Sequence, residues 1–192
     1  KEEFNNFYRH VPERVLIILD EAYYEFAQKL DDFPDSMLYR YDNVITLRTF
    51  SKAYGLAGLR LGYGFARKQL IENLMKVKAP FEPSIISQIA GNAALDDNIF
   101  LKKTLKSNEK EMDFLTSELN KLQIKNIRSA TNFLTTKWTS EKQANKVANF
   151  LFDNGIIIRK LNSFGWQEYL RISIGNHIEN KKLIKSLKKF YD

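Results

Sequence analysis

The sequence of 192 residues contains no cysteine, which excludes disulfides, thiolate metal sites and cysteine nucleophiles. Histidine occurs only at His10 and His177, so a metal site built mainly from imidazoles is excluded as well, and we expect no metal. No apolar run approaches the roughly 18 residues that predict a membrane-spanning helix, and no signal-peptide pattern opens the chain. The absence of cysteine fits the cytosol. We therefore expect a cytoplasmic protein that binds no membrane.

What the sequence does contain is typical of a folded domain with a basic surface. Hydrophobic residues make up 44% and aromatic residues 13%, which argues against disorder. The net charge is +7, and lysines concentrate in 101–125 and 181–189, where they alternate with apolar residues at helical spacing. This pattern predicts two amphipathic helices with solvated basic faces. A nucleic-acid surface is the alternative, but no recognition-helix signature accompanies the lysines, so we expect no nucleic acid and a mild preference for anionic ligands.

Two apolar runs end next to residues that can carry chemistry. The run Val15–Leu19 is unbroken and predicts a strand buried on both faces, as in parallel sheets. It closes on Asp20, Glu21 and Tyr23. The run Val44–Leu47 repeats the pattern, and Lys52 follows its carboxyl end. Ligands of open α/β sheets bind at the carboxyl ends of strands, so we expect Asp20 and Lys52 to face one crevice.

The rest of the chain alternates between helical and extended patterns. Ser140 is expected as the N-cap of one helix and Gly155 as the residue just after its end. Pro83 is expected in the first turn of another. Residues 1–13 are expected to be the end of a helix or a loop. The predicted helices are 36–41, 68–77, 84–95, 98–122, 140–154 and 178–191, and the further strands are 59–66, 124–128, 132–138, 156–159 and 169–174.

A lysine amine beside a strand-end carboxylate suits pyridoxal phosphate better than it suits hydrolysis. This cofactor needs an amine for its aldehyde, an anion beside its pyridine nitrogen, a donor to its ring oxygen and anchors for its phosphate. Lys52, Asp20 and Tyr23 can meet the first three needs. Ser51 and Arg60 can hold the phosphate, because bonds from a guanidinium to an anion are strong.

Two motifs resemble the histidinol-phosphate aminotransferase family. Ile18–Phe26 reads Ile-Leu-Asp-Glu-Ala-Tyr-Tyr-Glu-Phe, and Thr49–Tyr63 reads Thr-Phe-Ser-Lys-Ala-Tyr-Gly-Leu-Ala-Gly-Leu-Arg-Leu-Gly-Tyr. The resemblance continues through Gly155–Arg159 and Tyr169–Gly175. It implies an α/β fold, made of part of the large, mostly parallel-sheet domain of a fold type I aminotransferase and the smaller C-terminal α/β domain. It implies a transaminase of histidine biosynthesis that uses pyridoxal 5'-phosphate and works as a homodimer on small amino-acid and phosphate substrates.

The same resemblance implies roles for individual residues. Lys52 is the lysine that forms the Schiff base and the base that moves the proton. The cofactor-binding residues are Asp20, Tyr23, Thr49, Ser51, Lys52 and Arg60. Arg171 is implied to bind the anionic end of the substrate, either a carboxylate or a phosphate. Arg159 is implied as a second contact for the substrate phosphate.

Members of this family are about twice as long as this chain. We therefore expect residues 1–97 to be the C-terminal part of the large domain, residues 98–192 to be the small domain, and the chain alone to bind cofactor poorly and to be inactive. Two alternatives stay open. One is another enzyme on this scaffold, such as a threonine-phosphate decarboxylase or an aromatic-amino-acid aminotransferase. The other is a non-catalytic aminotransferase-like module.

Overall fold

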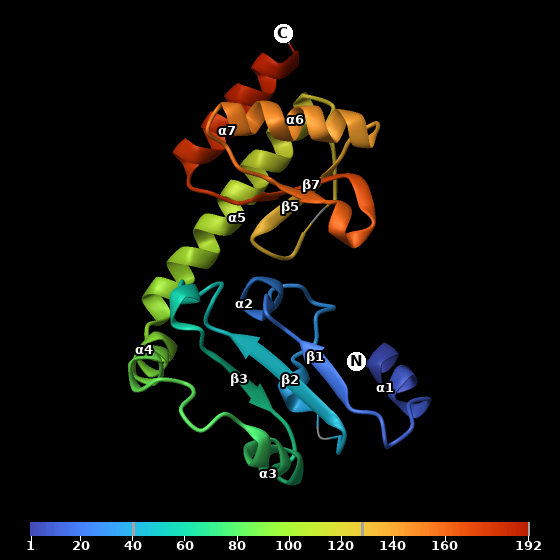
Figure 1. The fold of residues 1–192 in the computed structure, drawn as a ribbon, viewed down its shortest axis with the longest axis vertical. Helices are drawn as coiled ribbons and strands as arrows, with labels where there is room; N and C mark the ends of the chain where they lie inside the picture. The colour runs from blue at the N-terminus through green and yellow to red at the C-terminus, as the bar shows by residue number, and fades with distance from the viewer. Residues whose placement is uncertain (40, 128, 192) are drawn as a thin grey trace. The chain divides into compact units, whose positions relative to one another are not determined.

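The computed structural model describes residues 1–39, 41–127 and 129–191. The chain forms two compact units, Lys1–Lys102 (unit 1) and Lys103–Asp192 (unit 2), and each has its own sheet and helices (Figure 1). None of the described helices is both long enough and apolar enough to cross a membrane. The assignment of residues 1–97 and 98–192 to two aminotransferase domains stays a prediction.

Unit 1 is built on a three-stranded sheet in the order β1-β2-β3. β1 and β2 are parallel, with Asp20 in register with Leu47, and β3 is antiparallel to β2. The carboxyl ends of β1 and β2 therefore meet at one edge of the sheet (Figure 1). In chain order the elements are α1 (Glu2–Arg9), β1 (Ile17–Asp20), α2 (Tyr24–Ala27), η1 (Ser36–Leu38), β2 (Val44–Thr49), η2 (Ala57–Leu59), β3 (Gly62–Phe65), α3 (Lys68–Val77), α4 (Ile85–Asp96) and the start of α5 (Asn98–Lys121), where η marks a 3₁₀ helix.

The burial of β1 corrects one expectation. Ile17 is 8% exposed, whereas Ile18, which points to the opposite face of the sheet, is 57% exposed. The prediction that this strand is buried on both faces is therefore wrong. The physical reason is that no element of the described chain covers the Ile18 face of β1.

Local signals explain how α4 begins and where it packs. The Ser84 hydroxyl accepts a hydrogen bond from the Ser87 backbone N–H at 3.1 Å, which caps the helix. Pro83 thus lies before the cap and not in the first turn. A Cβ on Gly91 would lie only 2.4 Å from Leu61 Cδ2, so glycine allows α4 to approach the residues that lead into β3.

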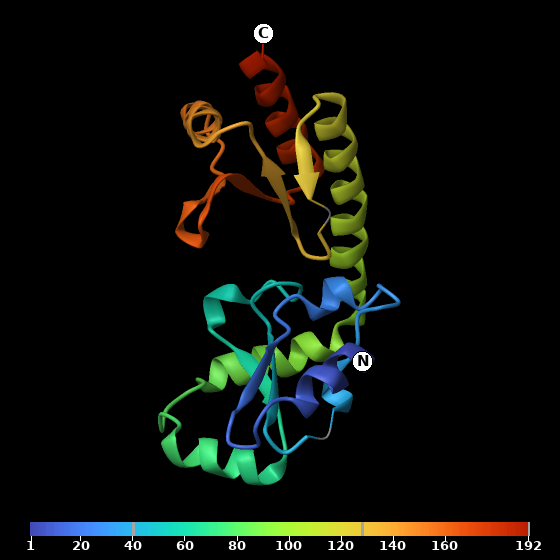
Figure 2. The ribbon, with the colours of Figure 1, turned by 90° about the vertical axis from the view of Figure 1, so that its right-hand side faces the viewer.

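Unit 2 is an antiparallel sheet in the order β4-β5-β7-β6, with helices packed on it (Figure 2). Side chains from α5, α6, α7 and one face of the sheet form a single core, with Leu115, Leu134, Leu151, Leu170 and Leu187 all fully buried. After the remainder of α5, its elements are β4 (Lys125–Ile127), β5 (Phe133–Lys137), α6 (Glu141–Asp153), β6 (Arg159–Leu161), η3 (Asn162–Phe164), β7 (Trp166–Ser173) and α7 (His177–Tyr191).

Helix boundaries in unit 2 follow the predicted caps. The Ser140 hydroxyl accepts from the Gln143 N–H at 3.2 Å, and Gly155 follows the C-cap with φ of +71°, a left-handed conformation that favours glycine. Both cap predictions are confirmed.

Several strand and helix predictions need adjustment. The strand expected at 156–159 begins only at Arg159, because Ile156 and Ile158 pack against the core from an irregular segment. The strand expected at 59–66 begins at Gly62, because η2 ends at Leu59 and Arg60 adopts a left-handed conformation between them. The helix expected at 36–41 is the single 3₁₀ turn Ser36–Leu38. Arg128, the last residue of another expected strand, lies outside the described residues.

Candidate functional site

Most of the candidate cofactor residues of unit 1 lie on two turns at the carboxyl ends of β1 and β2. Asp20 is the last residue of β1 and begins the first turn. Its Oδ1 accepts a hydrogen bond from the Ala22 N–H at 3.1 Å, and the side chain is exposed. Tyr23 lies on the same turn, just before α2. A carboxylate and a phenol thus lie together at the end of one strand.

Lys52 lies on the second turn, three residues after β2 ends at Thr49. Its Nζ is 5.5 Å from the centroid of the Tyr23 ring. The Lys52 side chain is exposed, so its amine is open to solvent. The fold therefore brings Asp20, Tyr23 and Lys52 to one edge of unit 1.

Hydrogen bonds join the start of the second turn to Leu61, which follows Arg60. Thr49 Oγ1 accepts from the Ser51 N–H at 3.1 Å and donates to the Leu61 carbonyl at 3.4 Å. The Phe50 N–H donates to the same carbonyl at 3.2 Å. Thr49 and Ser51 are thereby held close to the residues that follow Arg60. Five of the six candidate residues of unit 1 lie on these two turns, and Arg60 lies at the end of η2.

Arg60 adopts a conformation that is uncommon for a residue with a side chain. Its φ is 51° and its ψ is 45°, and its Nη1 donates to the Ala57 carbonyl at 3.0 Å. Such left-handed residues cluster at functional sites, where the surrounding structure maintains them. The conformation directs an exposed guanidinium outward from the end of η2.

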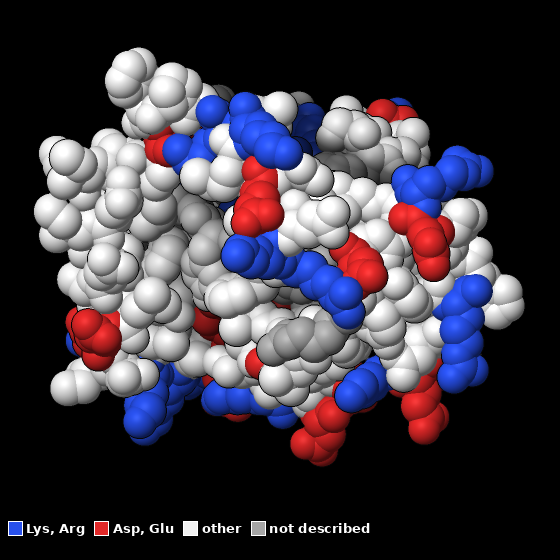
Figure 3. All heavy atoms as spheres, turned by 90° about the horizontal axis from the view of Figure 1, so that it is seen from below, with Lys and Arg blue, Asp and Glu red and all other residues white. Residues whose placement is uncertain are grey.

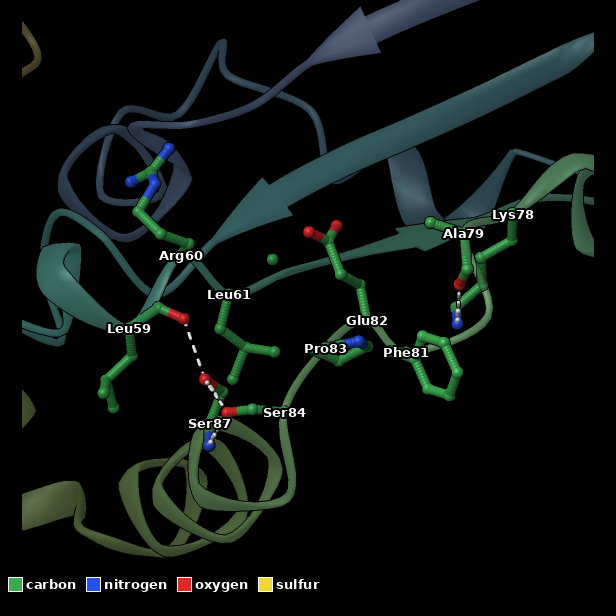
Figure 4. Close-up of a pocket in the computed structure, with 11 residues that line it drawn as sticks. Leu59, Arg60, Leu61, Lys78, Ala79, Phe81, Glu82, Pro83, Ser84 and Ser87 are labelled. Atoms are coloured by element: carbon green, nitrogen blue, oxygen red, sulfur yellow. Dashed lines mark hydrogen bonds between the residues drawn. The ribbon is translucent and has the colours of Figure 1, made fainter.

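A pocket of about 440 Å³ borders Arg60 between the start of β3 and the segment that leads into α4. Ser84 and Ser87 also line this pocket, and Figure 4 shows the Arg60 guanidinium pointing away from them. Ser87 Oγ donates to the Leu59 carbonyl at 2.8 Å, and the Ser84 hydroxyl bonds Ser87. Asp20 and Lys52 do not line this pocket.

A buried ion cluster lies beside the two turns, and the sequence reading missed it. Arg48 is 7% exposed and Glu21 is 8% exposed. Arg48 Nε and Nη2 donate to Glu21 Oε2 at 3.0 and 2.8 Å, and Nη2 also donates to Asp35 Oδ1 at 2.7 Å. The signal was present: Arg48 follows Val44 and Thr46 at alternate positions of a strand pattern, which places its charge on their buried face.

A second missed group surrounds Glu25 of α2. This carboxyl is 2% exposed, and its Oε2 has no hydrogen-bond partner within the described part of the chain. Burial raises the pKa of Glu25, although Arg48 opposes the change. Burial, with the Glu25 carboxyl as a second cause, raises the pKa of Tyr54 to about 12. The interior beside the Lys52 turn therefore disfavours negative charge.

The two candidate arginines of unit 2 are direct neighbours across strands. Arg159 of β6 and Arg171 of β7 occupy the same register position. The Cζ of Arg159 lies 5.3 Å from the Phe164 ring centroid, and that of Arg171 lies 4.9 Å from the Phe133 centroid. Arg171 Nε is buried and has no hydrogen-bond partner among the residues that the structure describes. Two cations side by side with an unused donor form a suitable site for an anion.

Surface charge outside these sites is mixed. In the face shown in Figure 3, Lys and Arg side chains lie next to Asp and Glu side chains and are separated by broad uncharged areas. In the described ranges, no group of three or more His, Asp or Glu side chains is arranged to hold a metal ion.

Comparisons with known proteins identify the family. The family model "Aminotransferase class I and II" matches residues 1–187. Histidinol-phosphate aminotransferase 2 of Carboxydothermus hydrogenoformans is 39% identical over 190 residues, which are 98% of this chain and 52% of the relative. The chain thus spans about half the length of the curated relatives it matches.

Solved structures agree with this assignment. The crystal structure of histidinol-phosphate aminotransferase from Sinorhizobium meliloti in complex with pyridoxal-5'-phosphate matches with a TM-score of 0.90 and 32% identity, over 98% of this chain and 52% of that chain. The L-threonine-O-3-phosphate decarboxylase from Porphyromonas gingivalis matches with a TM-score of 0.79 and 22% identity, over 99% and 58% respectively, which shows a shared fold alone. The predicted fold class and the resemblance to histidinol-phosphate aminotransferases are confirmed. The chain belongs to the class I and II aminotransferase family.

Proposed function

We propose that the full-length protein containing this chain is a pyridoxal-phosphate-dependent transaminase of histidine biosynthesis. Its reaction would convert histidinol phosphate and 2-oxoglutarate into imidazole-acetol phosphate and glutamate. The observation that carries the proposal is the meeting of Asp20, Tyr23 and Lys52 at one sheet edge, with Lys52 Nζ 5.5 Å from the Tyr23 ring centroid. The family match and the names of the relatives support the reaction and the substrate.

The residues present fit the cofactor. Asp20 offers an exposed carboxylate for the pyridine nitrogen, Tyr23 a phenol for the ring oxygen, and Lys52 an exposed amine for the aldehyde. Thr49, Ser51 and Arg60 offer hydroxyls and a guanidinium for the phosphate. When bound, pyridoxal phosphate supplies an electron-accepting ring that stabilises negative charge at the substrate's α-carbon.

Each side chain has a distinct task in this proposal. Lys52 Nζ would take the proton from the substrate's α-carbon and would act in turn as the acid that gives it up. An amine acts as a base only in its uncharged form. The Asp20 carboxylate keeps the pyridine nitrogen protonated. The Tyr23 hydroxyl orients the ring by donating a hydrogen bond to its oxygen.

In unit 2, Arg159 and Arg171 would bind the anionic groups of the substrates. A guanidinium forms paired hydrogen bonds with either a carboxylate or a phosphate. The unpartnered Nε of Arg171 and the neighbouring charge of Arg159 support this role. The same pair serves both half-reactions, because both substrates are anions.

The proposal extends to the wider organisation of the protein. Residues 1–97 would belong to the large cofactor-binding domain and residues 98–192 to the small domain. Unit 1 exposes large apolar side chains, including Phe81 at 91% and Val77 at 81%, which an assembly such as a homodimer would cover. We also propose the cytoplasm as its location, in line with a sequence that contains no cysteine.

Turnover assays on the full-length protein test the function. We expect glutamate to form from histidinol phosphate and 2-oxoglutarate, and Lys52→Ala to abolish its formation. Unchanged turnover by Lys52→Ala would end the proposal. Release of carbon dioxide from threonine phosphate, without glutamate formation, would instead favour the decarboxylase alternative.

A further inference from the structure

Arg48 connects the two turns that carry the candidate cofactor residues. Glu21 directly follows Asp20, and Arg48 directly precedes Thr49. Two hydrogen bonds join Arg48 to Glu21 Oε2, and the Glu21 backbone N–H donates to the Leu47 carbonyl at 2.9 Å. Side chain and backbone thus cross-link the ends of β1 and β2 where both turns begin.

The geometry around Arg48 depends on the planar shape of a guanidinium. Its Cζ lies 3.3 Å from the centroid of the Tyr24 ring, so the group stacks on the residue that follows Tyr23. Nη2 also donates to Asp35 Oδ1 at 2.7 Å, while Nε and Nη2 donate to Glu21. The ammonium group of a lysine is not planar, so it cannot stack on Tyr24 and donate to both carboxylates in this way. Lysine therefore preserves the charge of Arg48 but not its geometry.

Arg48 lies on the face of the sheet opposite to Asp20 and Thr49, the two candidate residues that belong to strands. Its side chain shares a buried face with Val44 and Thr46, whereas the side chains of Leu47 and Thr49 point the other way. Asp20 is in register with Leu47 and lies on that other face. Arg48 therefore has no place among groups that touch the cofactor, and any effect on the site passes through the turns.

We propose that Arg48 is a positioning residue that sets the orientation of the Asp20–Tyr23 turn relative to the Thr49–Lys52 turn. This inference rests on the proposed function, because it concerns the residues proposed to hold pyridoxal phosphate. A carboxylate and an amine that bind opposite ends of one rigid ring must be held at a fixed separation. A displacement of either group by about 1 Å costs on the order of 100-fold in rate. The Arg48 cluster supplies the rigid connection.

The test compares Arg48→Lys with Arg67→Lys in the full-length protein. Arg67 is a matched control, because it forms an ion pair with Asp42 but is 55% exposed. Cofactor affinity and the pH midpoint of the visible absorption band are measured well below the melting temperature of each apoprotein. We expect Arg48→Lys to weaken pyridoxal phosphate binding by about tenfold or more and to shift the midpoint, whereas Arg67→Lys changes neither.

A purely structural role predicts a different result. Arg48→Lys would then lower the melting temperature and leave the affinity and midpoint of the folded protein unchanged, which would overturn the inference. If Arg48→Lys does not fold, Glu21→Gln replaces it, since the amide retains an acceptor for Arg48 without the charge. We expect a weaker loss of affinity in the same direction, and either wild-type affinity or loss of the fold in this variant would overturn the inference. A wild-type protein that shows no visible band with the cofactor would reject the proposed function, and the inference with it.

Discussion

Replacement of Arg171 by lysine gives the sharpest prediction about the substrate site. The variant retains a positive charge on β7 but loses the planar fork and the buried Nε donor, which has no partner among the described residues. If an anionic substrate uses this donor, the loss is one hydrogen bond between charged groups, worth about 1.5–3 kcal/mol. We therefore expect kcat/KM to fall by about 10- to 150-fold.

Steady-state kinetics of the full-length protein measure this effect with both substrates varied. Because Arg171 is proposed to bind the anion in both half-reactions, kcat/KM should fall for the amine donor and for the keto acid alike. Lys137→Ala is the matched control. Lys137 lies in the same sheet, in register with Tyr169 and not with either arginine. We expect it to change kcat/KM by less than about twofold, as is usual for a solvent-exposed charge.

An assay without turnover supports the kinetics. Inorganic phosphate should raise the melting temperature of the apoprotein, since a ligand that binds only the folded state stabilises it. Arg171→Lys and Arg159→Lys should both reduce this increase. Wild-type kinetics and an undiminished phosphate effect in Arg171→Lys would refute the assignment of Arg171 to substrate binding.

Two further predictions concern stability. Burial alone would raise the pKa of Glu111, but hydrogen bonds from Asn180 at 2.9 Å and His177 at 3.1 Å outweigh it and hold the pKa below its usual value. This stabilisation is present above the unfolded pKa of about 4.3 and is lost as pH falls through the lower folded pKa. In denaturant titrations, Glu111→Gln should therefore destabilise the protein by about 1–3 kcal/mol at pH 7 and progressively less at acid pH. A destabilisation that stays constant down to pH 3 would contradict this account. Gly91→Ala should cost about 1–2 kcal/mol net in the same titrations, because overpacking against Leu61 Cδ2, 2.4 Å from the new Cβ, outweighs the gain of roughly 0.5–1 kcal/mol in helix stability. Wild-type or higher stability would show that the Leu61 side chain moves aside.

Helix boundaries were predictable where a single side chain determines them. The Ser140 hydroxyl and the left-handed Gly155 act within one turn of the chain, so their neighbours in sequence are sufficient to predict α6. The strand expected at 156–159 was displaced because Ile156 and Ile158 pack into a core formed by distant residues. A run of isoleucines looks the same in the sequence whether it forms a strand or an irregular segment that packs into the core.

The candidate site shows a similar division. Asp20 and Lys52 were expected at one crevice because parallel strands align their carboxyl ends. The register that pairs Arg159 with Arg171 could not be predicted, since it depends on the irregularity between Lys160 and Leu161. Arg48 was missed because a charge in a strand pattern is usually solvated, and only the fold brings Glu21 to it.

Covalent trapping at Lys52 tests the central claim most directly. The full-length protein is mixed with pyridoxal phosphate, reduced with borohydride and digested, and the modified peptide is identified by mass spectrometry. We predict one stoichiometric modification on Lys52, which disappears in Lys52→Ala and is reduced at limiting cofactor in Asp20→Ala. Modification spread over other lysines, or none on Lys52, would contradict the assignment of this sheet edge as the cofactor site.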